Sequence, residues 1–452
     1  MGIIRNRTSG MFLYRAAQWI AGIAAVPVLP LLLALNARNL RKSVKHRLGF
    51  IPTLSENRGE PRIWFHAASV GEISAVAPLI HCVRREWPAA CILMTTFTDA
   101  GLEMARGLRV EADAFGYFPL ELPGCAPRAV RRFRPHLCVV AETEIWPDFL
   151  HSAAVSGARL ILVNGRISSK SLKKYRLILS VFRRAVGRFN ILSMRYQSDA
   201  QKMESLGINS QRLVVTGNLK HEHLMSRVNP AMAQEYCKRL GLEPGREVLV
   251  AGSTWEGEEK IVLNAYRRLK ELRHGLSLIL APRHVQRSGK VQEMLREEGM
   301  GVVRLSSLNG GEKPDPESVV LVDTIGDLFG LYGIATLVFC GGSLVRVGGQ
   351  NIFEPAAWGR VVFHGSHMDN FLEEQEALEK VGASFTVQNE DEIVRVALDL
   401  LYDPARREKL GNDAAQAVKK SAGAKQKNLA LIRALLEGSD PGKFIESRTC
   451  EA

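Results

Sequence analysis

The sequence contains no Cys-x-x-Cys pair, no Asp-x-Asp pair and no cluster of histidines or cysteines at metal-ligand spacing. Its seven cysteines are scattered along 452 residues, a pattern that favours a reduced compartment and argues against disulfides or a zinc site. A mechanism without a metal is therefore predicted. Recognition-helix, zinc-finger and aromatic-basic RNA signatures are also missing, so nucleic acid is not an expected partner.

Acidic residues are absent from two stretches of the chain. The first fifty positions hold eight Lys and Arg but no Asp or Glu, and the segment between Asp148 and Asp199 is equally free of acids. The excess of basic residues behind the net charge of +13 is therefore concentrated in parts of the chain. Because basic patches attract polyanions, an anionic membrane is the predicted neighbour, and a solvated helix face is the alternative for the second stretch. Basic residues of that stretch include Arg166, Lys170, Lys173, Lys174, Arg176, Arg183, Arg184 and Arg188.

A membrane segment is predicted at residues 16–35. These twenty residues carry no charge and could form about 30 Å of helix, the hydrocarbon thickness of a bilayer. Basic residues follow, and no small-residue cleavage site stands in the usual place, so an uncleaved anchor with the body in the cytosol is expected. Pro27 and Pro30 leave open a helix lying in the membrane interface. The other alternative is a buried core helix.

After residue 50, short apolar runs alternate with helical patterns, which predicts two α/β domains built on parallel sheets. A polar helical interval at 221–243 separates the two sets of runs, and a helical stretch at 404–436 ends the fold. Ligands of such sheets bind beyond the carboxyl ends of the strands, and two such domains suit a two-substrate transferase. The predicted strands lie in 62–69, 91–96, 136–142, 159–164, 189–195, 212–217, 247–253, 276–282, 302–305, 318–323 and 335–342.

Three acidic residues follow predicted strands of the first domain. Glu72 stands in the first turn of a helix expected to begin near Gly71, where a carboxylate could accept a proton from a hydroxyl or only stabilise the helix dipole. Glu142 and Glu144 would lie on one face if their strand continues, and like charges that close would raise one pKa. The alternative for this pair is two solvated loop acids.

Cations follow other predicted strands. Arg283 offers forked donors suited to a phosphate, and Lys220 could neutralise a second negative group. Either residue could instead belong to a structural ion pair. Residues 340–359 combine a glycine-rich turn, a helix expected to open near Asn351, and an acid at Glu354. Backbone amides there are predicted to cradle a phosphate, and Glu354 to accept hydrogen bonds from ribose hydroxyls, unless the turn is purely structural.

Eight motifs occur in order across residues 42–371: H-x-x-S-V-G-E, E-T-E-I-W-P, N-G-R-I-S, T-G-N-L-K, G-S-T-x-E-G-E-E, P-R-H, D-T-I-G-D-L and G-G-S-L…G-G-x-N-x-x-E. Together they resemble the 3-deoxy-D-manno-octulosonic acid (Kdo) transferases of Gram-negative bacteria. The resemblance implies a GT-B fold, with two Rossmann-like domains facing across a cleft. It gives a membrane anchor at 1–50, an acceptor domain at 51–220, a CMP-Kdo domain at 221–410, and a helix crossing back with a polar tail at 411–452.

The same resemblance implies roles for particular residues. Glu72 matches the family's catalytic base, and Glu142 and Lys220 match residues assigned to transition-state stabilisation. Two positions depart from the family, because Trp255 and Gln350 stand where many relatives have His. They put local donor contacts in doubt. The implied nucleotide site comprises Pro282, Arg283, Ile325, Gly326, Asp327, Asn351, Ile352, Phe353 and Glu354.

The implied function is inverting transfer of Kdo from CMP-Kdo to the lipid A precursor, in lipopolysaccharide synthesis at the cytoplasmic face of the inner membrane. CMP-Kdo, the acceptor and membrane lipids are the expected partners, and no cofactor or metal is required. Since a fold does not fix the donor, a GT-B enzyme using a UDP-sugar is one rival. A catalytically inactive nucleotide sensor at the membrane is the other.

Overall fold

A computed structural model describes residues 38–52, 59–310 and 314–439. The predicted membrane segment at 16–35 lies outside these residues. The chain divides into two units. The first comprises the residues up to Lys220 together with those from Ala422 onward, and the second runs from His221 to Ser421. Among the described residues, no helix has the length and apolar character needed to cross a membrane.

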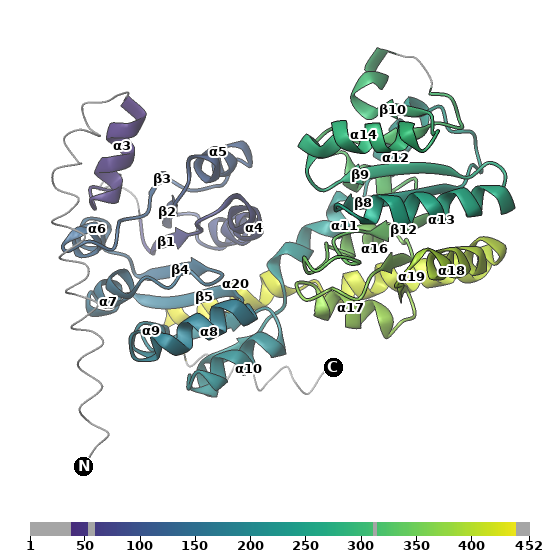
Figure 1. Cartoon of the computed structure of the whole chain (residues 1–452). Coiled ribbons are helices and arrows are strands. Elements are labelled where there is room, and N and C mark those ends of the chain that lie inside the picture. The colour runs from purple at the N-terminus through teal and green to yellow at the C-terminus, as the bar shows by residue number, and fades with distance from the viewer. Residues whose placement is uncertain (1–37, 53–58, 311–313, 440–452) are drawn as a thin grey trace. The chain divides into compact units, whose positions relative to one another are not determined.

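The first unit is built on a parallel sheet of seven strands in the order β3-β2-β1-β4-β5-β6-β7 (Figure 1). The strands are apolar because both faces of the sheet are covered: every residue of β2 is buried. Their bounds are β1 (Arg62–His66), β2 (Cys91–Thr96), β3 (Ala114–Tyr117), β4 (Leu137–Ala141), β5 (Arg159–Gly165), β6 (Ile191–Met194) and β7 (Leu213–Val215).

Alternate residues of these strands enter two separate cores. Trp64 belongs to one, where it packs edge-on against Phe133 and Phe149, and its neighbours Ile63 and Phe65 belong to the other. This period of two places helices on both faces of the sheet. The helices of the unit are α3 (Arg38–Arg47), α4 (Val70–Glu86), α5 (Asp99–Gly107), α6 (Cys125–Phe133), α7 (Pro147–Val155), α8 (Ser169–Leu177), α9 (Leu179–Val186), α10 (Gln197–Ser205) and α20 (Ala424–Glu437).

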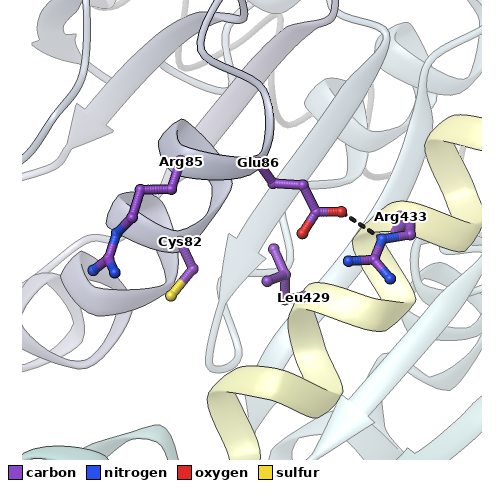
Figure 2. A pocket seen from close by; sticks show the side chains of 5 residues that line it. All are labelled: Cys82, Arg85, Glu86, Leu429 and Arg433. Atoms are coloured by element: carbon purple, nitrogen blue, oxygen red, sulfur yellow. Dashed lines mark hydrogen bonds and ion pairs between the residues drawn. The ribbon is translucent and has the colours of Figure 1, made fainter.

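The last helix, α20, completes the first unit although it is far from it in sequence. Leu431, Ile432 and Leu435 enter the same core as helix α4. Beside this contact is a hollow of about 530 Å³, where Arg433 pairs with Glu86 (Figure 2). Glu86 ends α4, about 20 Å along the helix from its first turn, so the hollow is remote from Glu72. The hollow is lined by Cys82, Arg85, Glu86, Leu429 and Arg433.

The second unit repeats the architecture with a parallel seven-stranded sheet in the order β10-β11-β9-β8-β12-β13-β14 (Figure 1). Its strands are β8 (Val248–Thr254), β9 (Ser277–Pro282), β10 (Val302–Arg304), β11 (Val319–Leu321), β12 (Leu337–Cys340), β13 (Val362–His364) and β14 (Ser384–Thr386). Its helices are α11 (Leu224–Arg227), α12 (Pro230–Arg239), α13 (Glu258–Leu272), α14 (Ser288–Glu297), α15 (Leu328–Tyr332), α16 (Phe353–Ala357), α17 (Leu372–Glu379), α18 (Glu390–Tyr402) and α19 (Pro404–Lys420).

Two details differ from the sequence analysis. Strands β3, β13 and β14, which have three or four residues each, were not predicted. The domain boundary expected at residue 410 falls inside α19. That helix stays with the second unit because Ala414 and Val418 are buried in its core, and the division follows Ser421.

Candidate functional site

The candidate catalytic residues of the first unit lie at the switch point of its sheet, between β1 and β4, where the order of strand addition reverses. Strands β1 and β4 are neighbours, although β1 leads in sequence to β2 on the opposite side. The carboxyl ends of such a strand pair form a crevice in open α/β sheets. Strand β1 leads from this edge into α4, which carries Glu72, and β4 leads into Glu142.

Glu72 is held at the start of α4. Its carboxylate accepts hydrogen bonds from the backbone N–H of Ala68 and the hydroxyl of Ser69, each at 2.8 Å. Ser69 is the N-cap of the helix and accepts in turn from the backbone N–H of Glu72. This reciprocal arrangement resembles a capping box, so Glu72 also stabilises its own helix. The alternative interpretation, in which Glu72 only stabilises its helix, therefore describes part of its role.

Burial changes the acidity of Glu72. Only 9% of the residue is exposed, and this burial raises the pKa of its carboxyl group from 4.5 to about 7. The hydrogen bonds from Ala68 and Ser69 lower the pKa, whereas the charges of Glu142 and Glu144 raise it. A helix cap alone needs no such shift. A carboxylate with a pKa near neutrality is suited to general-base catalysis.

Glu142 and Lys220 form an ion pair beside Glu72. The ammonium Nζ of Lys220 lies 2.7 Å from Oε1 of Glu142. A Cβ atom built on Gly71 would lie 3.9 Å from the same Nζ, which places the ammonium against the first turn of α4. The structure thus brings all three predicted catalytic residues together. The side chain of Lys220 remains partly exposed, so its charge is accessible to a ligand.

Glu144 does not share a face with Glu142, and that prediction was wrong. Strand β4 ends at Ala141, and Glu142 has a left-handed backbone with φ of +51°, so the extension does not continue. The carboxylate of Glu144 instead accepts a hydrogen bond from the indole N–H of Trp146 and lies 3.7 Å from the ring of His66. Although burial opposes it, these contacts hold the pKa of Glu144 below its usual value.

In the second unit, the predicted nucleotide residues gather at the carboxyl edge of four adjacent strands, β11, β9, β8 and β12. Pro282 ends β9, and the exposed Arg283 follows, its backbone N–H donating to the carbonyl of Thr254 at 2.9 Å. Burial raises the pKa of Glu354, while the nearby charges of Arg227 and Arg283 lower it. Arg283 and Glu354 therefore face a common region.

The loop between β11 and α15 carries three further predicted residues. Asp327 is held in place, because its carboxylate accepts hydrogen bonds from the hydroxyls of Tyr236 at 2.6 Å and Thr324 at 2.5 Å. Gly326 has a left-handed backbone with open space around it. Ile325 is 87% exposed, which is unusual for an isoleucine and leaves an apolar surface at the edge of the site.

In the first part of the glycine-rich turn after β12, three backbone amides are bound by the chain itself and do not cradle a phosphate. For the rest of residues 340–359, the phosphate cradle stays a prediction. The buried carboxylate of Glu258 accepts hydrogen bonds from the backbone N–H groups of Gly342, Ser343 and Leu344 at 2.6–2.9 Å. The N–H of Gly349 donates to the carbonyl of Gly342 at 2.7 Å. Residues 342–344 therefore form an anion-binding nest whose anion is the Glu258 carboxylate of the same chain.

The segment from Asn351 to Glu354 serves the site in two ways. The side chains of Ile352 and Phe353 are buried in the core, so they anchor this segment to the second unit. Asn351 accepts a hydrogen bond from the backbone N–H of Phe353 at 3.1 Å, at the start of the short helix α16. Glu354 remains partly exposed and is the member of this segment whose carboxylate lies among the nearby cations.

Several residues of the two sites were missed by sequence analysis. Arg227, Tyr236 and Arg239 come from the helical interval before β8, yet they approach Glu354 or Asp327. No sequence signal marks them, because the contacts join segments about ninety positions or more apart. The described residues contain no group of three or more His, Cys, Asp or Glu side chains that could hold a metal ion.

Comparisons with known proteins identify relatives of this chain. Residues 42–223 match the family model of "3-Deoxy-D-manno-octulosonic-acid transferase (kdotransferase)". A 3-deoxy-D-manno-octulosonic acid transferase of Haemophilus influenzae is 31% identical over 90% of this chain and 94% of its own length. The protein with the same name from Aquifex aeolicus is 30% identical over 78% of this chain and 89% of its own length.

Solved structures resemble the chain in fold. A putative UDP-N-acetylglucosamine 2-epimerase from Listeria monocytogenes superimposes with a TM-score of 0.60 at 16% identity, covering 85% of this chain and 99% of its own. A glycosyltransferase from Rickettsia africae gives 0.57 at 12% identity, covering 84% and 100%. The architecture is α/β of the GT-B type, with two Rossmann-like units. From this fold and the relatives of similar length, the chain belongs to the 3-deoxy-D-manno-octulosonic acid (Kdo) transferase family and is a glycosyltransferase.

Proposed function

We propose that the chain transfers Kdo from CMP-Kdo to a sugar hydroxyl of the lipid A precursor, with Glu72 as the general base. The observation that carries this proposal is a buried carboxylate whose pKa is about 7, next to the Glu142–Lys220 ion pair at the switch point of the first sheet. The experiment that tests it is turnover of CMP-Kdo and lipid acceptor by Glu72 variants.

The proposed chemistry is one displacement with inversion. The Glu72 carboxylate accepts the proton of the acceptor hydroxyl, and the oxygen bonds to the anomeric carbon of Kdo from the side opposite the phosphate. The bond between that carbon and the phosphate oxygen breaks, and CMP leaves with the electron pair. The transition state carries negative charge on the leaving phosphate, so fixed cations lower the barrier. Lys220 and Arg283 supply them in this proposal, which includes no metal ion or cofactor.

Arg283 is proposed to bind the donor phosphate, and this gives a prediction for nucleotide binding. Replacing Arg283 by alanine should weaken CMP binding by about ten- to a hundredfold, because a charge-assisted hydrogen bond contributes about 1.5–3 kcal/mol. Calorimetric titration with CMP measures the change. Arg296→Ala, which removes an exposed arginine in the last turn of α14, is the control and should bind CMP normally. Normal CMP affinity in Arg283→Ala would contradict the assignment.

The nucleotide also separates this proposal from an enzyme that uses a UDP-sugar. CMP at a hundred times its Kd should raise the melting temperature, since binding then stabilises the folded state by about 2.7 kcal/mol, whereas UDP at the same concentration should not. A larger shift with UDP would favour the rival donor.

The second acid-free stretch has a surface suited to a membrane and a phosphorylated lipid. Lys173, Lys174 and Arg176 on α8 are exposed. At the junction of α8 and α9, Leu177 is 86% exposed and Ile178 is 53% exposed. Exposed apolar side chains flanked by cations are typical of segments that dip into an anionic bilayer surface. These features support placing the chain at the cytoplasmic face of the inner membrane, with this surface holding the acceptor's phosphates.

Charge reversal tests the role of this surface. The triple variant Lys173→Glu, Lys174→Glu, Arg176→Glu should raise the apparent KM for the lipid acceptor and reduce sedimentation with anionic vesicles, because each cation near such a surface contributes about 1 kcal/mol. The KM for CMP-Kdo should stay unchanged. A matched triple reversal on α19, at Lys409, Lys419 and Lys420, serves as the control. Unaltered acceptor KM and vesicle binding would show that these three cations form only a solvated helix face.

A further inference from the structure

We infer that Asn164 is the residue that positions Lys220 against Glu142, an inference that rests on the proposed role of Lys220 in transfer. Asn164 lies near the end of strand β5 and is fully buried. Its side-chain Oδ1 accepts a hydrogen bond from the backbone N–H of Leu219 at 3.0 Å. Leu219 directly precedes Lys220, so this bond fixes the backbone from which the lysine side chain extends.

The other partner of the ion pair is held by the same end of β5. The carbonyl of Val163 accepts a hydrogen bond from the backbone N–H of Glu142 at 2.9 Å. Two consecutive residues therefore support the ion pair. Val163 bonds to the backbone of Glu142, and Asn164 bonds to the backbone of Leu219, next to Lys220. The distance between Nζ and Oε1 depends on this shared support.

The backbone has an unusual conformation both just after β4 and near the end of β5. Glu142 has φ of +51° and Asn164 has φ of +56°, in the left-handed region that favours glycine. The pairing of β5 with β6 shifts register between Leu162 and Gly165, around Asn164. Non-glycine residues persist in such conformations where surrounding contacts hold them, and they cluster at functional sites. Asparagine tolerates this conformation better than most residues.

The Asn164 side chain makes its contact through the amide oxygen Oδ1, which accepts a hydrogen bond, and not through the amide nitrogen Nδ2. Among the residues that the structure describes, the buried Nδ2 has no hydrogen-bond partner. Glycine would suit the left-handed backbone at this position, but it would leave the N–H of Leu219 without its acceptor. Aspartate keeps an acceptor and a short side chain and loses a donor that makes no bond here, but it also introduces an ionisable carboxyl group at a buried position. These two substitutions separate the backbone conformation from the side-chain bond.

Turnover of the variants tests the inference. Asn164→Gly should lower kcat by about ten- to a hundredfold, the scale of a small displacement of a catalytic group, with little change in the KM for CMP-Kdo. Asn164→Asp should retain much more of kcat than Asn164→Gly. If Asn164→Gly turns over like the native chain, the acceptor bond does not position the lysine.

The same strand offers a matched control. Asn190 accepts a hydrogen bond from the backbone N–H of Leu160 at 2.8 Å, near the amino end of β5. Asn190→Ala removes a similar bond far from Lys220 and should leave kcat unchanged, even if its melting temperature falls as much as that of Asn164→Gly. Equal losses of kcat in both variants would mean that turnover reports only the stability of β5, and would overturn the inference.

A double-mutant cycle with Lys220→Ala separates this inference from the proposed function. If Asn164 acts through Lys220, Asn164→Gly should have little further effect on kcat in the Lys220→Ala background. An equal fold-loss in both backgrounds would overturn the positioning role alone. Full turnover by Lys220→Ala would instead remove the proposed role of the lysine, and the inference with it.

Discussion

Glu72→Gln is expected to lower kcat by at least about 10², the scale of losing a general base, while leaving CMP binding near normal. Glutamine has the size of glutamate and can still accept one hydrogen bond from Ala68 or Ser69, but it cannot take a proton from the acceptor hydroxyl. Steady-state turnover with CMP-Kdo and lipid acceptor measures the loss, and calorimetry with CMP measures binding. Unchanged turnover would refute the assignment of Glu72 as base.

A second glutamate in the chain provides a close control for the capping role. In α18, Asn389 is the N-cap, and the carboxylate of Glu392 accepts a hydrogen bond from the backbone N–H of Gln388 at 3.0 Å. This repeats the contact of Glu72 with Ala68, four positions earlier. Glu392→Gln should alter stability slightly and leave kcat unchanged. If both variants lost activity equally, helix capping would account for the effect of Glu72.

The dependence on pH provides a second readout for the same residue. The base must be ionised, so kcat/KM should rise as the pH increases through about 7, where Glu72 loses its proton. Stability should change in the opposite direction. The pKa is 4.5 without burial and about 7 in the folded chain, so the folded state binds more protons between these values and stability falls as the pH rises from 4.5 to 7. Glu72→Gln should abolish this contribution to both curves.

Lys220→Ala is expected to lower kcat by about 10²–10³, the range found when one group that stabilises transition-state charge is removed. The variant also leaves Glu142 without its partner, and an uncompensated carboxylate would repel the donor's phosphate and carboxylate. Lys220→Arg keeps the charge but changes its shape, so it should recover only part of the activity. Single-turnover kinetics with saturating CMP-Kdo separate this loss from weaker donor binding.

Lys260→Ala is the control for removing a lysine from an ion pair. Its Nζ lies 3.2 Å from Glu298 on the surface of the second unit, and its side chain is largely exposed. Such pairs contribute little to stability, and no predicted site residue contacts this one. Turnover should therefore be unchanged. If Lys220→Ala behaved in the same way, its contact with Glu142 would be only a surface ion pair.

Much of the fold could be predicted from the sequence, because buried parallel strands consist of continuous runs of apolar residues. The run at 91–96 coincides with β2, and the run at 159–164 covers most of β5. The three candidate catalytic residues could be chosen because each follows such a run. Parallel strands end at the same edge of a sheet, so residues distant in sequence were expected to meet there.

The remaining features depend on contacts that a single sequence does not reveal. Glu258 occupies the glycine-rich turn because β8 and β12 are neighbours in the sheet, and strand order has no local signal. Glu142 and Glu144 do not continue the strand together because Glu142 has a left-handed backbone, which its residue type does not indicate. Asn164 is part of a motif, but its bond to Leu219 joins positions 55 residues apart.

The first unit is assembled from both ends of the chain, and this has a consequence for biosynthesis. When a ribosome has added Ser421, the helix that carries Glu72 has already been made, but α20, which covers part of its apolar side, has not. Until Leu431, Ile432 and Leu435 emerge, that hydrophobic surface is exposed to water and to chaperones. A nascent or prematurely terminated polypeptide would therefore contain the proposed proton acceptor without a finished core beneath it.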